Sequence, residues 1–284
     1  MKTQAAVALL LVSIIRTVSA QAPSNGTSPG AFVQVDGSQL YYQECGEGPK
    51  AVVLIHDGVV DSAVWDDVWP AFCKQFHTIR YDRRGYGRSP VTKKPYFEAD
   101  DIAALLHDRK VGQAALVASS HGGNVALNFA LRYPTQVSDL VLVGPAAEGF
   151  PYSENFLMAQ MEFQNAKDPV EVRAQSTYFI VPGHEAAREH LRTLLKASPQ
   201  DHNHDDMPLP EKPVFPYVQD LRMPVLILIG SGDIADNQAV AGALVMAIPR
   251  AVRVVVPDAG HLMYLEKPDA FFSLVNGFLK SQSF

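Results

Sequence analysis

Ser120 is the residue whose surroundings point most directly to chemistry. It lies within residues 118–123 (ASSHGG), between an apolar run typical of a strand and a run typical of a helix. A serine on such a sharp turn exposes its hydroxyl, and the unpaired N–H groups of the helix start stabilise a developing oxyanion. Ser120 has a small glycine two residues later, whereas Ser119 has a histidine at that position. Ser120 is therefore the predicted nucleophile.

A serine hydroxyl is a weak nucleophile unless a base takes its proton and a carboxylate orients that base. Asp233 follows the apolar run 224–230, and His261 follows the run 251–256. If both runs are strands of one parallel sheet, the loops after them meet at the edge where open α/β sheets carry their active sites. We expect Asp233, His261 and Ser120 to act there as acid, base and nucleophile.

Other polar residues compete for these roles. Asp236 is an alternative acid, but it falls where a helix cap is expected. Glu148 occupies a rarer position for the acid, after an earlier apolar run, and His56 is expected to organise a buried loop rather than act as a base. Residues 201–206 (DHNHDD) include metal-binding types without regular ligand spacing, so we predict a solvated loop. We predict no metal and no organic cofactor.

The elements that must position these residues are strands alternating with helices, over residues 32–146 and again over 221–284. Such alternation predicts a parallel sheet with helices on both faces, and the β-rich runs around Asp36 and Gly37 predict an antiparallel hairpin at its start. The stretch 147–220 is mostly helical and aromatic, and we interpret it as an inserted helical cap. Its large apolar residues are expected mainly to form helix core, with some roofing an apolar pocket: Phe150, Phe156, Met158, Met161, Phe163, Tyr178 and Phe179.

Composition and charge exclude several classes of protein. The chain has 284 residues, of which 47% are hydrophobic and 19% charged, which excludes a disordered tail, a collagen-like chain and a disulfide-stapled miniprotein. The formal net charge is −6 and no basic runs occur, which argues against a nucleic-acid binder. A chain of this length buries a sufficient core without a metal.

The N-terminus has the pattern of an export signal. Lys2 precedes an apolar run at 5–15, and small residues follow at 18–20. The apolar run is shorter than the roughly twenty residues that span a bilayer. We therefore predict a cleaved signal peptide over 1–20, a flexible lead-in over 21–31, and a secreted or periplasmic protein with no membrane span in its mature chain.

Both cysteines, Cys45 and Cys73, lie in the predicted mature chain, where an oxidising compartment allows a disulfide. The predicted hairpin ends at Cys45, and a predicted helix over 63–73 ends at Cys73, near the beginning of the run 77–81. Proximity makes a Cys45–Cys73 disulfide one alternative, and two buried free thiols are the other.

The chain resembles the α/β-hydrolase superfamily from about Phe32 to its C-terminus. Besides the turn at Ser120, the resemblance is carried by three segments, namely 54–58 (LIHDG), 82–89 (DRRGYGRS) and 260–268 (GHLMYLEKP). It implies the α/β-hydrolase fold, a mostly parallel sheet with an antiparallel N-terminal hairpin and an inserted helical cap. The chain order of nucleophile, acid and base is also the order expected of this fold.

The resemblance further implies an oxyanion hole made by the backbone N–H groups of Gly58, or Val59, and His121. The sequence departs from the family pattern at Asp57, which stands in place of a glycine, and at Ala118, which replaces the first glycine of the serine turn. A carboxylate near a developing oxyanion is repulsive, so the Asp57 side chain is expected to point away from it.

These expectations lead to an exported serine hydrolase that acts on an ester, lactone or similar acyl bond of a small molecule. A serine in place of a nucleophilic aspartate argues against the dehalogenase and epoxide-hydrolase branches. The alternatives are C–C bond hydrolysis, cofactor-free haloperoxidase-like chemistry, and a binding or receptor protein with negligible turnover. Asp57 is the only feature of the sequence that favours the last alternative.

Overall fold

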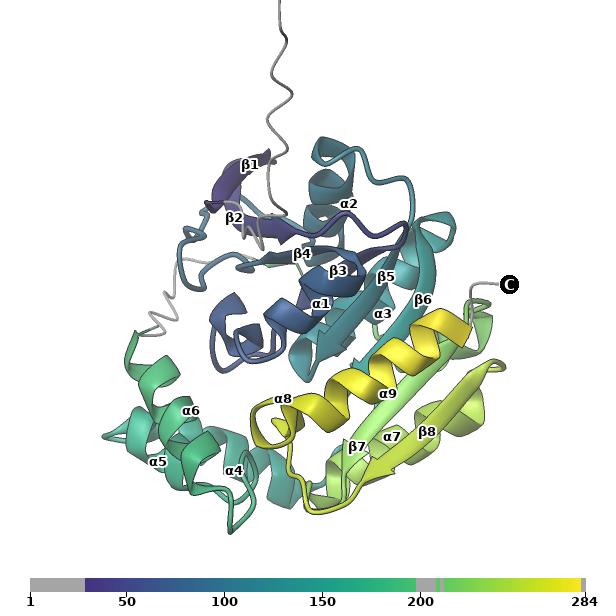
Figure 1. The fold of residues 1–284 in the computed structure, drawn as a ribbon. Coiled ribbons are helices and arrows are strands. Elements are labelled where there is room, and N and C mark those ends of the chain that lie inside the picture. Colours follow the sequence, from purple (N-terminus) through teal and green to yellow (C-terminus); the bar gives the residue numbers. More distant parts are fainter. Residues whose placement is uncertain (1–28, 198–207, 210–211, 282–284) are drawn as a thin grey trace, which may run out of the picture.

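A computed structural model describes residues 29–197, 208–209 and 212–281 of the chain (Figure 1). The predicted signal peptide, all but the last three residues of the predicted lead-in, and the Asp- and His-rich stretch at 201–206 lie outside the described residues. The last residue of the predicted lead-in, Ala31, opens the first strand. Among the described helices, none is both long enough and apolar enough to cross a bilayer.

One sheet of eight strands runs through the described residues in the order β1-β2-β4-β3-β5-β6-β7-β8. The pairs β1–β2 and β2–β4 are antiparallel, and all the other neighbouring pairs are parallel. This arrangement confirms the predicted parallel sheet with its antiparallel hairpin. The strands are β1 Ala31–Val35, β2 Ser38–Cys45, β3 Ala51–Ile55, β4 His77–Tyr81, β5 Ala114–Ser119, β6 Val137–Val143, β7 Val225–Gly230 and β8 Ala251–Val256.

Helices cover both faces of the sheet, which explains why the central strands are apolar on both sides. Successive residues of β3 face opposite cores: Val53 packs with residues of α2, α3 and α7, whereas Leu54 packs with residues of α1 and α9. The helices and 3₁₀ turns are η1 Ser62–Trp65, α1 Trp69–Gln75, α2 Glu98–Asp108, α3 His121–Arg132, η2 Pro134–Gln136, α4 Glu154–Asn165, α5 Pro169–Gln175, α6 Glu185–Ala197, η3 Phe215–Asp220, α7 Ala235–Ala247, α8 Met263–Glu266 and α9 Pro268–Ser281.

The single helix predicted over 63–73 is wrong, because two short elements, η1 and α1, occupy this stretch. Asp61 caps η1 by accepting a hydrogen bond from the Ala63 N–H at 2.8 Å. Pro70 lies in the first turn of α1, where its missing N–H costs nothing, whereas inside one long helix it would break the hydrogen-bond ladder.

The helices α4, α5 and α6 lie between β6 and β7 in sequence, and Figure 1 shows them grouped to one side of the sheet. Asp168 caps α5 by accepting from the Glu171 N–H at 2.9 Å. The expectation that the apolar residues of this region form helix core holds only in part on α4, which has no fully buried residue. Phe163 packs against the buried cluster that includes Phe179, whereas Met158 and Met161 are each 62% exposed.

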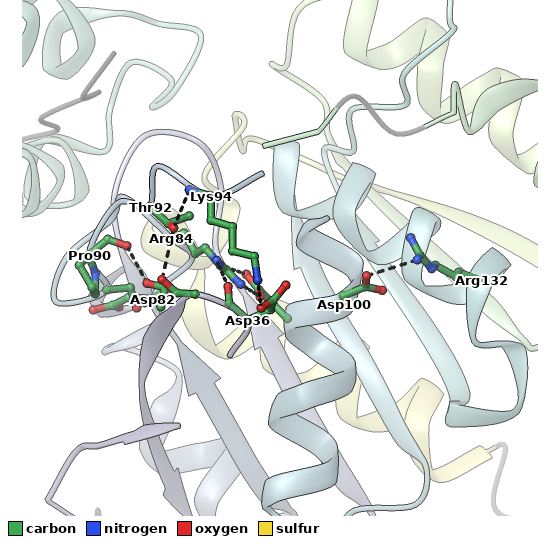
Figure 2. A network of polar contacts seen from close by, with 12 residues as sticks. Asp36, Asp82, Arg84, Pro90, Thr92, Lys94, Asp100 and Arg132 are labelled. Carbon is green, nitrogen blue, oxygen red and sulfur yellow. Dashed lines mark hydrogen bonds and ion pairs between the residues drawn. The ribbon is translucent and has the colours of Figure 1, made fainter. Parts of the chain in front are cut away.

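The segment 82–89, one carrier of the family resemblance, serves the fold through polar contacts. Asp82 accepts from the backbone N–H groups of Ser62 (3.0 Å) and Arg88 (2.9 Å). The Arg84 guanidinium donates to the backbone carbonyl of Asp36 at 2.9 Å, and Figure 2 shows it meeting Lys94 at that residue. This segment therefore fastens the loop after β4 to the β1–β2 turn.

A disulfide joins Cys45, the last residue of β2, to Cys73 in α1, with their Cα atoms 5.2 Å apart. The bond closes a loop over a sequence separation of 28 residues. It ties the antiparallel edge of the sheet to the helix that precedes β4.

Removing this disulfide is expected to lower the free energy of unfolding by about 3–4 kcal/mol, the loop-entropy value for a separation of this size. Urea unfolding with and without a reductant measures the effect on the wild type. The double variant Cys45→Ala/Cys73→Ala should have the same urea midpoint as the reduced wild type, and adding the reductant should leave that midpoint unchanged. A wild-type midpoint that reductant leaves unchanged would contradict the expectation.

Candidate active site

Ser120 lies at the junction of β5 and α3 with φ 51° and ψ −120°, a backbone conformation that is strained for a residue other than glycine. Its own N–H donates to the Val143 carbonyl, and its carbonyl accepts from the Ala146 N–H, both at 2.9 Å. A Cβ on Gly122 would lie 2.3 Å from the His56 carbonyl oxygen, so only glycine fits there. The surroundings therefore hold Ser120 in the turn that a nucleophile requires.

Asp233 and His261 meet on the loops that follow β7 and β8. His261 Nδ1 lies 3.0 Å from Asp233 Oδ2, and the two residues are 1% and 7% exposed, respectively. The other carboxylate oxygen of Asp233 accepts from the Ile234 N–H and from the Asn237 side-chain amide, each at 2.8 Å. An imidazole that carries its proton on Nδ1, directed to Asp233, keeps a lone pair on Nε2, as a general base must.

The loop between β6 and α4 brings these residues toward Ser120. Besides the hydrogen bond that the Ala146 N–H donates to the Ser120 carbonyl, this loop carries Gly144, whose φ is +50°. A Cβ on Gly144 would lie 2.8 Å from His261 Nδ1 and 3.2 Å from Asp233 Oδ2. The same short loop therefore touches both the turn at Ser120 and the Asp233–His261 pair, and it requires glycine where it passes that pair.

The Ser120 hydroxyl itself makes no hydrogen bond within the part of the chain that the structure describes. The partner of His261 Nε2 is instead the hydroxyl of Tyr178, at 3.2 Å. Sequence reasoning missed the contacts of both Tyr178 and Asn237. Asn237 lies in the first turns of the helix predicted over 236–248, just after the loop that carries Asp233, and this closeness in sequence is the one signal that could have indicated its contact. No pattern in the sequence indicates that Tyr178 lies here.

Glu266 holds the loop that carries His261. Its carboxylate accepts from the backbone N–H groups of Gly260 at 2.6 Å and Val181 at 2.7 Å. One side chain therefore bridges the loop that carries His261 and the segment that precedes α6. This accounts for the glutamate in the last segment of the resemblance.

Asp57, which stands in place of a glycine, turns its carboxylate into the protein interior. One oxygen accepts from the N–H groups of Val59 (2.5 Å) and Val60 (3.0 Å), and the other accepts from the Tyr264 hydroxyl (2.9 Å). Burial raises the pKa of the Asp57 carboxyl, so its negative charge is disfavoured in this position. The carboxylate thus fixes the turn after β3.

Of the two predicted donors on this turn, Val59 already gives its N–H to Asp57. Gly58 lies beside His121: a Cβ on Gly58 would be 3.5 Å from the His121 Cβ. The His121 side chain is half exposed, with Nε2 3.2 Å from Glu98 Oε2. Gly58 and His121 are therefore neighbours, as two donors to one oxyanion must be.

His56 is fully buried and organises this loop, as predicted. Its Nδ1 donates to the Asp57 carbonyl at 2.7 Å, and its Nε2 accepts from the Arg83 N–H at 2.9 Å. Burial and the nearby Arg83 guanidinium lower the pKa of His56 to about 3. A neutral ring with both nitrogens engaged does not serve as a second base.

Because His56 is neutral in the folded protein and protonates below about pH 6.5 in the unfolded chain, its contribution to stability is lost as the pH falls. Between about pH 6 and pH 4, the slope of unfolding free energy against pH should be shallower in His56→Gln than in the wild type by about 1.4 kcal/mol per pH unit. Urea unfolding of both proteins at several pH values measures this difference. Parallel slopes would show that His56 is protonated in the folded state.

The competing acids lie elsewhere. Asp236 is the second residue of α7 rather than its cap, and its two oxygens accept from the Ser153 N–H (2.7 Å) and hydroxyl (2.8 Å). The Asp236 carboxylate therefore binds Ser153 at the start of α4, and the expectation that Asp236 caps α7 is wrong. Glu148 is exposed. Among the described residues, no group of three or more histidine, cysteine or acidic side chains is arranged to hold a metal ion.

Comparison with known proteins gives a consistent result. Residues 52–274 match the family described as "Alpha/beta hydrolase family". The chain is 27% identical to the pimeloyl-(acyl-carrier protein) methyl ester esterase of Yersinia enterocolitica, over 86% of this chain and 99% of that protein. It is 25% identical to the 2-hydroxy-6-oxo-6-phenylhexa-2,4-dienoate hydrolase of Comamonas testosteroni, over 86% of this chain and 92% of that protein.

A similar solved structure is that of Est816, described as an N-acyl homoserine lactone degrading enzyme. Its TM-score is 0.74 at 26% identity, with 87% of this chain and 100% of that chain covered. The names of these relatives describe an esterase, a hydrolase and a lactone-degrading enzyme, each with a different substrate. With the matching family, the eight-stranded sheet and the strained serine elbow in agreement, the chain belongs to the alpha/beta hydrolase family.

Proposed function

We propose that the protein is an exported serine hydrolase that cleaves an ester, lactone or similarly activated acyl bond. The observation that carries the proposal is the buried hydrogen bond between His261 and Asp233, joined through the Gly144 loop to the strained elbow of Ser120. Nucleophile, base and orienting acid are the three parts of this chemistry, and each stands on a separate loop at the same edge of the sheet.

In the proposed reaction, the Ser120 oxygen attacks the acyl carbon while His261 Nε2 takes the hydroxyl proton. Asp233 holds the imidazole in the required tautomer and stabilises the imidazolium that forms. The backbone N–H groups of Gly58 and His121 stabilise the oxyanion. His261 then returns the proton to the leaving oxygen, and water hydrolyses the acyl-enzyme by the same steps.

C–C bond hydrolysis is the second candidate, because one relative is a hydrolase of 2-hydroxy-6-oxo-6-phenylhexa-2,4-dienoate. The two candidates differ in the leaving group, which is an oxygen in an ester and a carbon in the dienoate. Ser120, His261 and Asp233 are compatible with both reactions, so the substrate that the protein turns over distinguishes them.

Export remains part of the proposal and is supported by two features. The first is the N-terminal pattern of a basic residue, an apolar run and small residues. The second is the disulfide between Cys45 and Cys73, since disulfides persist in oxidising compartments. Sequencing the N-terminus of the mature protein tests export, with a start at Gln21 as the expected result.

A fluorophosphonate probe tests the hydrolase proposal, because it reacts with serines that a base activates. We expect labelling at neutral pH, with the adduct located on Ser120, rather than on adjacent Ser119, by fragmentation of the labelled peptide. Turnover of short and medium p-nitrophenyl esters, compared with that of a dienoate, then distinguishes acyl from C–C hydrolysis. A folded wild type that reacts with neither probe nor ester would favour a binding protein.

A further inference from the structure

Tyr178 brings its hydroxyl to the nitrogen of His261 that the proposed reaction uses. The tyrosine follows α5, in the inserted region, and its oxygen lies 3.2 Å from His261 Nε2. The two rings lie against each other, with centroids 4.5 Å apart and planes inclined by 38°. Since Nδ1 of the same ring faces Asp233, Nε2 is the nitrogen that must receive the Ser120 proton.

When Nδ1 of His261 carries the ring proton, the Tyr178 hydroxyl is the donor to Nε2. The Asn237 side-chain nitrogen lies 2.8 Å from Asp233 Oδ1, 3.1 Å from His261 Nδ1 and 3.4 Å from the Tyr178 oxygen. It faces that oxygen as a donor, which leaves the phenolic hydrogen to point elsewhere. Burial raises the pKa of the Tyr178 hydroxyl, so the proton stays on it at neutral pH. The acceptor within reach is the lone pair on His261 Nε2.

Ser120 needs the same lone pair. A neutral imidazole whose Nδ1 carries the proton has one acceptor site, so two hydroxyls cannot both donate to it well. Within the described residues, the Ser120 hydroxyl makes no hydrogen bond, whereas Tyr178 occupies that site. The free protein therefore holds the base on Tyr178 and leaves the nucleophile unactivated.

The backbone of Tyr178 is fastened to the loop that carries His261. The His261 N–H donates to the Tyr178 carbonyl at 3.2 Å, and the Leu262 N–H donates to the Phe179 carbonyl at 3.1 Å. The Glu266 carboxylate bridges the same two segments. Because the backbone is held at these points, rotation of the Tyr178 side chain is the simplest motion that frees Nε2.

We propose that Tyr178 is a positioning residue whose hydroxyl holds His261 Nε2 in the free protein and releases it to Ser120 when substrate binds. This inference rests on the proposed function. An ester or lactone carries an acceptor oxygen on its leaving-group side, next to the position that His261 must reach to protonate it. That oxygen offers the Tyr178 hydroxyl a replacement partner, so substrate binding and activation of the nucleophile are coupled.

The test is the rate of inactivation by a small alkyl fluorophosphonate. In this reaction the Ser120 oxygen forms a bond to phosphorus, the hydroxyl proton passes to His261, and fluoride leaves with the electrons of the P–F bond. Tyr178→Phe is expected to react about fivefold faster than the wild type, the factor that one net hydrogen bond between neutral groups represents. A variant that loses structure would be inactivated more slowly. Faster inactivation therefore distinguishes a positioning role of Tyr178 from a purely structural one.

Tyr152→Phe is the matched control, because its hydroxyl accepts from the Ala147 N–H at 3.1 Å near the start of the same insertion. This variant should react at the wild-type rate. Unchanged or slower inactivation of a folded Tyr178→Phe variant, with the wild type still labelled on Ser120, would overturn the inference and leave the proposed hydrolase standing. Failure of both proteins to react would overturn the hydrolase proposal and the inference with it.

If the Tyr178→Phe variant does not fold, a crystal structure of the phosphonylated wild type tests whether Tyr178 releases His261 Nε2. We expect the Tyr178 oxygen to lie more than about 3.5 Å from Nε2 in the adduct, beyond hydrogen-bond distance. A Tyr178 hydroxyl still bonded to His261 in the adduct would show that the two hydroxyls do not compete.

Discussion

Replacing Ser120 by alanine is expected to lower the rate of ester hydrolysis by about 10⁴- to 10⁶-fold. In the proposed reaction the substitution removes the atom that bonds to the acyl carbon, and the remaining parts of such a site sustain only a small residual rate. The fold should persist, since the hydrogen bonds that hold the elbow come from the backbone of residue 120. Steady-state kinetics with a p-nitrophenyl ester measure the loss, and thermal unfolding verifies that the variant is folded.

Ser119→Ala is the matched control, because it removes the same atom from the neighbouring residue. The Ser119 hydroxyl is buried and lies 3.0 Å from the Tyr264 hydroxyl, on the side of the turn away from solvent. Its loss should cost about 1 kcal/mol of stability, one hydrogen bond, and at most about tenfold in rate. Equal losses in the two variants would mean that the elbow, and not the Ser120 hydroxyl, is what the substitutions damage.

The sheet and the arrangement of its loops could be predicted from the sequence because both depend on periodic patterns. Continuous apolar runs mark strands that are buried on both faces, and the turn residues after them mark one shared edge. The hydrogen bond between Asp233 and His261 follows from this topology, since their loops end neighbouring strands. These predictions need no knowledge of individual side-chain contacts.

The remaining features depend on packing between distant segments, which leaves no periodic signal. Tyr178 reaches His261 because two backbone hydrogen bonds and the Glu266 carboxylate fasten the insertion to the loop that carries His261. From the sequence alone, the Asp57 carboxylate is expected to repel a developing oxyanion. Only the structure shows that this carboxylate accepts hydrogen bonds from the Val59 N–H and the Tyr264 hydroxyl. On α4, the apolar residues suggest a core that the tertiary structure does not provide, as the exposed Met161 illustrates.

Replacing Asp233 by asparagine is expected to lower kcat by about 10⁴-fold, through the tautomer of His261. The structure fixes how the new amide must lie. The Ile234 N–H and the Asn237 amide both donate to one oxygen of Asp233, so the amide oxygen takes that position. The amide nitrogen then faces His261 Nδ1 and donates to it, which forces the imidazole proton onto Nε2 and removes the base.

Asp236→Asn is the matched control, because it makes the same change of one atom three residues away. Its carboxylate binds Ser153 at the start of α4, so we expect a small loss of stability and kcat within about threefold of the wild type. Hydrolysis kinetics of both variants against one ester measure the contrast. If Asp236→Asn caused the large loss and Asp233→Asn did not, the acid would belong to the neighbouring helix turn. A site that needs only a polar neighbour for His261 would tolerate the amide at residue 233, whereas a site that needs the lone pair on Nε2 loses its base when the tautomer changes.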